Sequence, residues 1–341
     1  MLGGVDRTRS ARVTRWLAAV AAACAFPAAA APPPRVVLAV DGVEETRNLP
    51  VLLAERLGYF KDEGLTVTLV DAPASPSPME LMKDGRADGA VAFYHHTFMS
   101  QADAGMVTQD VATLGVTPAL KLMVAARLKD KVRTPADLKG LRIFTGGPNS
   151  GKTTATNWLA LHAGFGVGGY VALKPTTARE MSEALKSGEA DAVMTHEPDA
   201  SYYDSSGAAF VLADLSRPAA VAAALGDVFP STALYMPQAY IDAHPEEVRR
   251  LVRACLHAVA YIRAHDAQSI AQVLPSRAVG KDRAAFLRTL ASDKAMFETD
   301  GRMPAAAARQ EWQVMTALTP KYGAIDFAAT YTNRFVEAAQ P

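Results

Sequence analysis

The stretch ELMKDGRAD, residues 80–88, recurs as EALKSGEAD at residues 183–191, with Glu, Lys, Gly, Ala and Asp at matching positions. Each copy runs directly into a strand-like segment, residues 89–93 in the first case and 192–195 in the second. A helix with a glycine turn and a further strand precede each copy, and this alternation is typical of parallel sheets covered by helices. Chance is the alternative, since glycine-capped amphipathic helices are common. We take the repeat to predict an α/β fold with two similarly built lobes.

The alternation of strands and helices extends along most of the chain. The first set of expected strands comprises residues 36–40, 66–70, 89–93, 111–116 and 122–125. The second set comprises residues 141–145, 171–173, 192–195 and 210–212, with a returning strand at 233–236. The C-terminal part is predicted to be helical at residues 245–264, 266–274, 282–291, 305–317 and 327–338. Ligands of such sheets bind outside the carboxyl ends of strands, so the candidate loops follow residues 40, 93, 145 and 195.

The first thirty residues have the order of a secretory signal. Four arginines are followed by an apolar segment at residues 16–26 and by alanines at residues 28–31, and cleavage after Ala30 fits this order. A membrane anchor is the alternative, but the apolar segment is shorter than the roughly 20 residues that a spanning helix needs. Lipid attachment at Cys24 is a minor alternative. We therefore predict a periplasmic protein that is exported by a cleavable signal.

Composition excludes several classes of function. The chain has 35 basic and 35 acidic residues without a block of one sign, which argues against a nucleic-acid partner and a polybasic membrane surface. After signal cleavage Cys255 is the single remaining cysteine, so an intramolecular disulfide is not available. Leu251 and Val259 share its helical face, which favours a buried structural thiol.

Residues 146–153, GGPNSGKT, match the phosphate-binding pattern G-x-x-x-x-G-K-[ST]. The match lies between an expected strand and an expected helix, where free backbone N–H groups and the helix dipole favour an anion. A P-loop ATPase is one interpretation, and Asp214 near the end of a later strand would then hold magnesium. The export signal disfavours this interpretation because the periplasm is poor in ATP. We expect the turn to capture an anion or another polar ligand.

Two further strand ends carry aromatic, imidazole and carboxylate groups. They are YHHT at residues 94–97 and THEPD at residues 195–199. The functional interpretation is that these side chains face a ligand in a cleft. A metal-dependent enzyme is a competing interpretation, and it requires these histidines or His162 to converge with Glu197. Hydrogen-bonded or solvent-facing histidines, with Asp199 as a helix cap, are the ordinary alternative.

The loop after the first expected strand contains Arg47 and Asn48. Both are candidates for pairing with a carboxylate or a sulfonate. Asn48, followed by Leu49 and Pro50, equally fits a helix cap with proline in the first turn. The sequence contains no G-x-S-x-G elbow and no Cys/His pair with the spacing of a nucleophile, so we expect binding without catalysis.

Three motifs in a fixed order resemble a known family. They are LGYFKDEGL at residues 57–65, TPADLKG at 134–140 and ALKSGEADA at 184–192, the last reaching Glu197 and Pro198. Over about residues 36–335 the chain resembles the nitrate/sulfonate/taurine and thiamine-precursor branch of substrate-binding proteins that serve ABC importers. The resemblance implies a periplasmic binding protein fold of type 2, with two α/β lobes joined by a two-strand hinge and a helical C-terminal segment. It also implies closure on a ligand held near residues 94–97, 149–153 and 196–199, and a membrane permease as partner.

One turn departs from the family pattern. A Gly-Ser-Ser-like run is usual at the start of the helix in the second lobe, whereas residues 148–152 read PNSGK and only Ser150 maps onto it. Lys152 adds a positive charge where the helix dipole disfavours cations, which favours an anionic ligand as compensation. A related eukaryotic branch makes the thiamine pyrimidine with a cysteine cluster that this chain lacks.

These observations lead to one prediction for the whole molecule. We expect a monomeric, extracytoplasmic binding component of an ABC importer that captures a small anionic solute, such as a sulfonate, taurine, nitrate or a pyrimidine thiamine precursor, and that uses no metal or cofactor. Its expected parts are the signal at residues 1–30, the first lobe at 31–126 and 229–341, and the second lobe at 127–228. The expected ligand-binding residues are Asn48, Tyr94, His95, His96, Thr97, Asn149, Ser150, Gly151, Lys152, Thr153, His196, Glu197 and Asp199.

Overall fold

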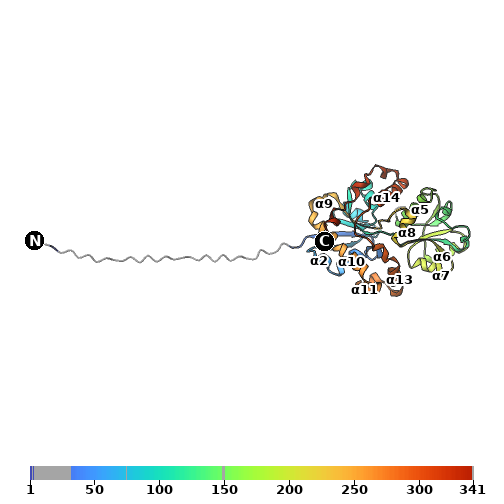
Figure 1. The fold of residues 1–341 in the computed structure, drawn as a ribbon, viewed down its shortest axis with the longest axis horizontal. Coiled ribbons are helices and arrows are strands. Elements are labelled where there is room, and N and C mark those ends of the chain that lie inside the picture. The colour runs from blue at the N-terminus through green and yellow to red at the C-terminus, as the bar shows by residue number, and fades with distance from the viewer. Residues whose placement is uncertain (2, 4–31, 74, 148–149, 340–341) are drawn as a thin grey trace. The chain divides into compact units, whose positions relative to one another are not determined.

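The computed structural model describes residues 1, 3, 32–73, 75–147 and 150–339. Every helix and strand named below belongs to one compact unit, Pro33–Pro341 (Figure 1). Residues 4–30 of the expected signal, Cys24 among them, lie outside the described residues, so the structure does not test that prediction. Among the described residues, no helix has both the length and the apolar character that crossing a membrane requires.

Five strands in the order β2-β1-β3-β10-β4 form the first sheet. Their bounds are β1 Arg35–Val40, β2 Thr66–Asp71, β3 Gly89–Ala92, β4 Thr108–Gly115 and β10 Thr232–Pro237. β1 is parallel to β2 and β3, whereas β10 is antiparallel to both of its neighbours. The helices between these strands are η1 Thr46–Asn48, α1 Leu49–Arg56, α2 Tyr59–Asp62, α3 Pro78–Lys83 and α4 His96–Ala104.

The second sheet repeats this arrangement with the order β7-β6-β8-β5-β9. Its strands are β5 Leu120–Ala125, β6 Arg142–Phe144, β7 Val171–Leu173, β8 Ala192–Thr195 and β9 Ala209–Leu215. β6 is parallel to β7 and β8, and β5 is antiparallel to β8 and β9. The main helices of this lobe are α5 Gly151–His162, α6 Ala178–Ser187, α7 Asp199–Ser205 and α8 Pro218–Leu225. The predicted α/β fold with two similar lobes is confirmed.

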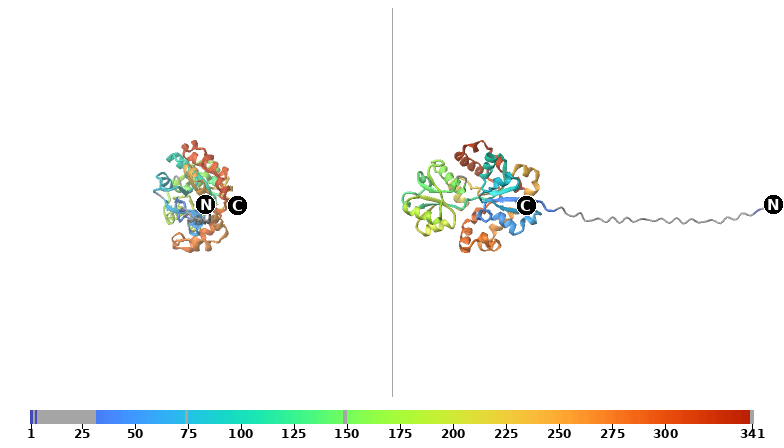
Figure 2. Two further views of the ribbon diagram at one scale, coloured as in Figure 1. Left: turned by 90° about the vertical axis from the view of Figure 1, so that its left-hand side faces the viewer. Right: turned by 180° about the vertical axis from the view of Figure 1, so that it is seen from behind.

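One strand in each sheet runs antiparallel to its neighbours, so each sheet is mixed, with a parallel part like that predicted from the alternation of strands and helices. β5 enters the second sheet directly after the chain has left β4, and β10 enters the first sheet after the chain has left β9 and α8. A strand that arrives from the other sheet has no crossover helix to reverse its direction, so it runs antiparallel to its neighbours. Figures 1 and 2 show the green and yellow segments gathered in one lobe and the blue, orange and red segments in the other. β5 pairs within the second sheet although it precedes residue 126, the expected end of the first part of the first lobe. The exact lobe limits stay a prediction.

The two copies of the repeat begin and end their helices in the same way. α3 and α6 each open with a capping box, in which the side chain of Ser77 or Thr177 accepts from the third backbone N–H of its helix. Each helix is followed by a glycine with positive φ, Gly85 at 67° and Gly188 at 88°. Glycine suits these positions because other residues adopt this backbone conformation only with strain. The repeated sequence therefore specifies a helix whose two ends are set by neighbouring residues.

The aspartates that close the two copies tie each helix to its sheet. Asp88 accepts from the backbone N–H of Val37 in β1 at 2.7 Å, and Asp191 accepts from that of Arg142 in β6 at 2.9 Å. Burial acts to raise the pKa of Asp191, but hydrogen bonds from Arg142 and Arg127 outweigh it and hold the pKa at about 2. The matching aspartate contacts place β3 and β8 beside equivalent strands, which explains why the repeat predicts the architecture.

The C-terminal segment is helical and packs mainly on the first lobe. Its α-helices up to residue 318 are α9 Gln238–Ala243, α10 Pro245–Ala264, α11 Ala267–Val273, α12 Ser276–Val279, α13 Arg283–Asp293 and α14 Ala305–Leu318. α10 packs against α1, α2 and β4, and α14 also contacts α5 of the second lobe. Cys255 in α10 is fully buried, and burial raises the pKa of its thiol to about 12, so the predicted structural thiol is confirmed.

The last expected helix, residues 327–338, is wrong as a single element. The structure has a 3₁₀ helix η6 (Phe327–Thr330) and a short helix α15 (Arg334–Glu337), with extended residues between them. Tyr331 in this break forms a parallel bridge with Asp110 of β4. Because β4 lies at the edge of the first sheet, its unpaired backbone groups are open to pairing, and this tertiary contact overrides the helical pattern.

The buried carboxyl of Asp110 makes stability depend on pH. It accepts from Thr113 Oγ1 at 2.6 Å and from Ala112 N at 3.0 Å, yet burial raises its pKa to about 7. The folded state therefore holds a proton that the unfolded chain releases, so this stabilisation is complete below the ordinary pKa of 3.8 and is lost as pH rises through about 7. Asp110→Asn should reduce the slope of unfolding free energy against pH in this window by up to about 1.4 kcal/mol per pH unit. Urea unfolding of both proteins across the window measures the slope, and identical slopes would contradict the assignment.

Candidate functional site

A cavity of about 370 Å³ lies between loops that follow the carboxyl ends of β1, β3, β6 and β8. These are the strand ends that the sequence indicates as binding loops. Both lobes, the crossing segment before β5 and the C-terminal segment contribute to its walls. The lining residues are Glu45, Thr46, Arg47, Phe93, Pro118, Ala119, Leu120, Gly146, Ser150, Gly151, Lys152, Pro175, His196, Glu197, Thr289, Asp293 and Met296.

Helix α5 begins at the wall of this cavity. Ser150 is its N-cap, and the Ser150 Oγ accepts from Thr153 N at 3.3 Å. The turn before it is tight, because a Cβ at Gly146 would lie 1.8 Å from Ser150 Oγ, and Thr153 Oγ1 donates to Gly146 O at 3.0 Å. The first turn of a helix has backbone N–H groups without helical partners, and the dipole favours an anion there. Asn149 lies outside the described residues.

Lys152 places an ammonium group beside the start of α5. Burial lowers its pKa, while the carboxylates of Asp199 and Glu45 act in the opposite direction. Among the described residues, no carboxylate lies within ion-pair distance of Lys152 Nζ. An anionic group in the cavity would therefore compensate a cation for which the described residues supply no ion-pair partner.

Arg47 contributes a second cation from the first lobe. Its Nη2 donates to the backbone oxygen of Asp41 at 2.6 Å and to Asp41 Oδ2 at 3.1 Å. Its Nη1 is buried and has no hydrogen-bond partner among the described residues. Asn48, the neighbouring predicted ligand residue, is fully buried and donates to the backbone oxygens of Asp41 and Gly42 at 2.7 and 2.8 Å. Asn48 thus holds the loop, and Arg47 is the residue that lines the cavity.

Phe93 brings the two lobes into contact. The guanidinium carbon of Arg47 lies 4.8 Å from the centroid of the Phe93 ring, and the His95 ring stacks on it at 5.4 Å. On the second lobe, a Cβ at Gly151 would stand 2.5 Å from Phe93 Cζ. Glycine at the start of α5 is therefore what permits this close approach. Sequence reasoning missed Phe93, because an aromatic residue at the end of a buried strand is indistinguishable from a core residue.

Three residues of the YHHT loop, Tyr94, His95 and Thr97, are buried in the first lobe, and His96 is partly buried. Tyr94 is fully buried, with its hydroxyl 2.5 Å from Thr330 Oγ1, and Thr97 Oγ1 donates to Tyr94 O at 2.9 Å. His95 Nδ1 lies 2.9 Å from Glu311 Oε1 of α14, and both side chains are fully buried. Burial, reinforced by nearby positive charge, holds the pKa of His96 well below its ordinary value, which favours the neutral imidazole. None of these four side chains lines the cavity.

The second loop with a histidine does reach the cavity, through His196 and Glu197. Burial lowers the pKa of His196, and the charge of Lys152 acts in the same direction. Glu197 Oε1 accepts from Lys121 Nζ at 2.5 Å. Burial acts to raise the pKa of Glu197, but the hydrogen bonds from Lys121 and Ser201 together outweigh burial and lower the pKa overall. Asp199 lies in the first turn of α7 and does not line the cavity.

The described residues contain no group of three or more His, Cys, Asp or Glu side chains arranged to hold a metal ion. The predicted ligand residues that line the cavity are Ser150, Gly151, Lys152, His196 and Glu197. The structure brings these five together with Arg47 and Phe93 from the first lobe. The functional assignment of each residue stays a prediction.

Asp293 is a wall residue that the sequence does not indicate. It is the last residue of α13, its side chain is 4% exposed, and its Oδ1 has no hydrogen-bond partner among the described residues. Burial raises the pKa of its carboxyl to about 7. Thr289 and Met296 of the same region also line the cavity. No motif marks this segment, because its place in the site depends on how the C-terminal helices pack.

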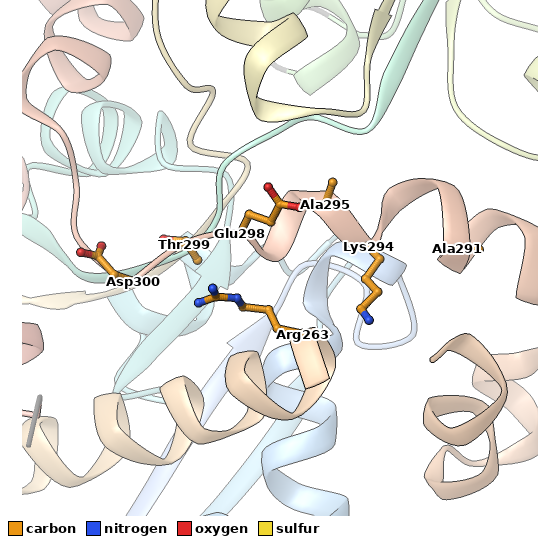
Figure 3. Close-up of a pocket in the computed structure, with 7 residues that line it drawn as sticks. All are labelled: Arg263, Ala291, Lys294, Ala295, Glu298, Thr299 and Asp300. Carbon is orange, nitrogen blue, oxygen red and sulfur yellow. The ribbon is translucent and has the colours of Figure 1, made fainter. Parts of the chain in front are cut away.

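A larger pocket of about 630 Å³ lies elsewhere, between α10 and the segment that follows α13 (Figure 3). Its charged residues are Arg263, Lys294, Glu298 and Asp300. Lys294 Nζ already donates to His265 O at 2.6 Å. All of its walls come from the C-terminal segment, so movement of one lobe against the other would not close it. We therefore place the candidate site in the cavity between the lobes.

Comparison with protein families identifies the chain. Residues 45–269 match the model of the family described as NMT1/THI5 like. The chain belongs to the NMT1/THI5-like family. No curated protein matches the chain in sequence. The family match covers the second sheet, every strand of the first sheet except β1, and every loop of the cavity except the part contributed by α13 and the residues after it.

Solved structures share the fold over nearly the whole chain. A protein from Bordetella bronchiseptica RB50 is 27% identical, with a TM-score of 0.72, and the match covers 89% of this chain and 96% of that one. A putative periplasmic sulfonate-binding protein of a sulfonate ABC transporter, from Methylobacillus flagellatus KT, is 17% identical, with a TM-score of 0.69 and coverage of 90% and 94%. The desulfurization enzyme DSZB is 14% identical, with a TM-score of 0.58 and coverage of 90% and 98%. The periplasmic binding protein fold is thus confirmed, and it accommodates binding proteins as well as an enzyme.

Proposed function

We propose that this protein is the extracytoplasmic substrate-binding component of an ABC importer and that it captures a small solute with an anionic group. The observation that carries the proposal is the cavity between the lobes, whose walls combine the N-terminus of α5 with Arg47 and Lys152. These groups come from both lobes, so a ligand in the cavity would contact both. The family membership and the shared fold of the sulfonate-binding protein support this function.

The mechanism that follows is hinge closure. A ligand that contacts both lobes stabilises the closed arrangement, because it makes some of its contacts only when the lobes approach. The crossing segments next to β4, β5, β9 and β10 are the natural hinge, since they connect the two sheets. The permease would then recognise the closed state and receive the solute. An exported, monomeric protein suits this role.

The ATPase alternative has little support from the arrangement of the second sheet. Asp214, the candidate magnesium ligand, lies on β9, and β8 and β5 separate that strand from β6. Its Oδ1 accepts from the backbone N and the Oγ of Ser216 at 3.0 and 2.6 Å. The carboxylate is thus engaged in a local turn, away from the loop that follows β6. We therefore propose binding without chemistry on the solute.

A ligand screen tests the proposed function. Protein purified from cells would be denatured and the released small molecules identified by mass spectrometry. The same protein would be screened by thermal shift against sulfonates, carboxylates, nitrate, pyrimidines and ATP, because a ligand that binds the folded state raises the unfolding temperature. We expect stabilisation by at least one non-nucleotide anion. Stabilisation and hydrolysis of ATP alone would overturn the proposal.

Two substitutions of Ser150 distinguish its role as the N-cap of α5 from a role in anion binding. Ser150→Ala should lower the free energy of unfolding by about 1 kcal/mol, because α5 loses its N-cap. Ser150→Asp keeps a capping side chain but adds a negative charge at the cavity wall, so it should preserve stability and weaken anion binding by at least about tenfold. Urea unfolding and calorimetry with the anion found in the screen measure the two effects. Unchanged anion affinity in Ser150→Asp would remove the start of α5 from the binding site.

A further inference from the structure

Two residues of opposite charge in the cavity lining, Arg47 and Asp293, each carry a buried polar atom that the described residues leave without a hydrogen-bond partner. Arg47 Nη1 and Asp293 Oδ1 are both buried and lack a hydrogen-bond partner among the described residues. No other cavity-lining residue has such an atom among those described. Burying a polar atom without a partner is costly, and an unsatisfied group at a binding surface indicates the chemistry of the missing partner.

The surroundings of Asp293 indicate a cationic or N–H partner. Burial raises the pKa of Asp293 and outweighs a hydrogen bond from the Ser292 side chain and the charge of Lys121, which act to lower it. The Lys121 ammonium group itself donates to Glu197 at 2.5 Å. The carboxylates of Glu197 and Asp214 act to raise the pKa of Asp293. Among the described residues, no cation lies within ion-pair distance of the buried Asp293 carboxyl. A ligand group that carries positive charge or donates a hydrogen bond would satisfy it.

The surroundings of Arg47 indicate the opposite partner. Its Nη2 is engaged with Asp41, and its Nη1 has no acceptor among the described residues. Arg47 and Phe93 both line the cavity. Lys152 and the first turn of α5 add further positive character from the second lobe. An acceptor such as a sulfonate or carboxylate oxygen fits this part of the cavity.

We propose that the cavity binds a dipolar solute whose anionic group pairs with Arg47 and the start of α5 and whose ammonium or similar cationic N–H group pairs with Asp293. The inference rests on the proposed solute-binding function and narrows its ligand class. Nitrate and simple alkanesulfonates carry no group for Asp293, so they would leave its carboxyl unsatisfied. Asp293 is thereby the residue that distinguishes dipolar solutes from plain anions.

Matched ligand pairs test the proposal. The affinity of the protein for 2-aminoethanesulfonate is compared with that for ethanesulfonate, and that for 3-aminopropanoate with that for propanoate, by calorimetry in a buffer without sulfonates or amines. The amine-bearing member of at least one pair should bind at least about tenfold more tightly, which corresponds to about 1.4 kcal/mol. Equal affinity within both pairs would overturn the proposal while leaving solute binding intact. Absence of binding by these compounds and by every anion of the screen would instead overturn the proposed function, and this inference with it.

The neutral variant Asp293→Asn tests whether Asp293 causes the preference for amine-bearing ligands. Asp293→Asn should reduce the preference for the amine-bearing ligand to less than about threefold and leave the affinity for the amine-free partner nearly unchanged. Asp300→Asn is the matched control, because Asp300 lies seven residues along the same segment with its side chain 56% exposed, outside the cavity lining. An equal loss of affinity for both members of a pair in Asp293→Asn would assign Asp293 a structural role and contradict the proposal. The comparison of ligand pairs on the unaltered protein stays decisive if the variant does not fold.

Discussion

Replacing Gly151 by valine should lower ligand affinity by roughly 10- to 100-fold while both lobes stay folded. A Cβ at residue 151 would lie 2.5 Å from Cζ and 2.7 Å from Cε1 of Phe93. The ring has little room to move, since the Arg47 guanidinium and the His95 ring pack against it at 4.8 and 5.4 Å. Overpacking of this kind costs about 1–3 kcal/mol, and each 1.4 kcal/mol is tenfold in affinity. The valine would therefore keep the lobes from the approach seen here, which calorimetry with the screened anion measures.

Two controls accompany this substitution. Gly147→Val changes a nearby glycine whose added Cβ would meet no atom of the described residues within 4 Å, so its effect on affinity should be small. The double variant Gly151→Val with Phe93→Leu removes the obstructing ring and should recover part of the lost affinity, as expected for residues in contact. Equal affinities for Gly151→Val and Gly147→Val would show that the contact between Phe93 and α5 has no role in binding.

Trp158→Ala should lower the free energy of unfolding by about 3–5 kcal/mol. Trp158 of α5 is fully buried in the core of the second lobe, with its ring 5.4 Å from that of Phe229. Its Nε1 donates to Leu225 O at 2.9 Å, so alanine would leave a large cavity and a buried carbonyl without its partner. Such a loss is a large fraction of the stability of an ordinary domain. Urea unfolding monitored by far-UV circular dichroism measures it.

The matched control lies three residues further along the same helix. Leu161 is 37% exposed, so Leu161→Ala removes less buried surface and should cost well under half as much as Trp158→Ala. Both variants leave the first turn of α5 intact, so both should retain the site in the fraction that is folded. A similar cost for the two variants would mean that Trp158 does not anchor this core.

Much of the fold was predictable because its determinants are local. Ser77 and Thr177 cap the N-termini of α3 and α6. Gly85 and Gly188 follow their C-termini with positive φ. The same sequence pattern therefore produces the same helix ends in both lobes. The strands that follow are buried along their whole length, as apolar runs between helices predict. The final helix was not predictable, because Tyr331 pairs with the edge of β4, a partner more than two hundred positions away in the chain.

The candidate site was predictable only in part. The turn at Ser150, Gly151 and Lys152 carries a local signal, since a glycine-rich turn before a helix creates free backbone N–H groups. The YHHT loop carries a similar signal, yet Tyr94 and His95 are fully buried in the first lobe. A sequence pattern identifies a loop at a strand end, but it does not tell which side chain turns outward.

By itself, the sequence determined the two-lobed α/β architecture, the ends of its repeated helices and the strand ends whose loops line the cavity, because caps, glycine turns and periodic burial act over a few neighbouring residues. Tertiary structure alone decided that Arg47, Phe93 and Asp293 meet the start of α5 around one cavity. The physical reason is that these residues come from the first lobe and the C-terminal helices, and their meeting depends on side-chain packing across the chain, which no local pattern encodes.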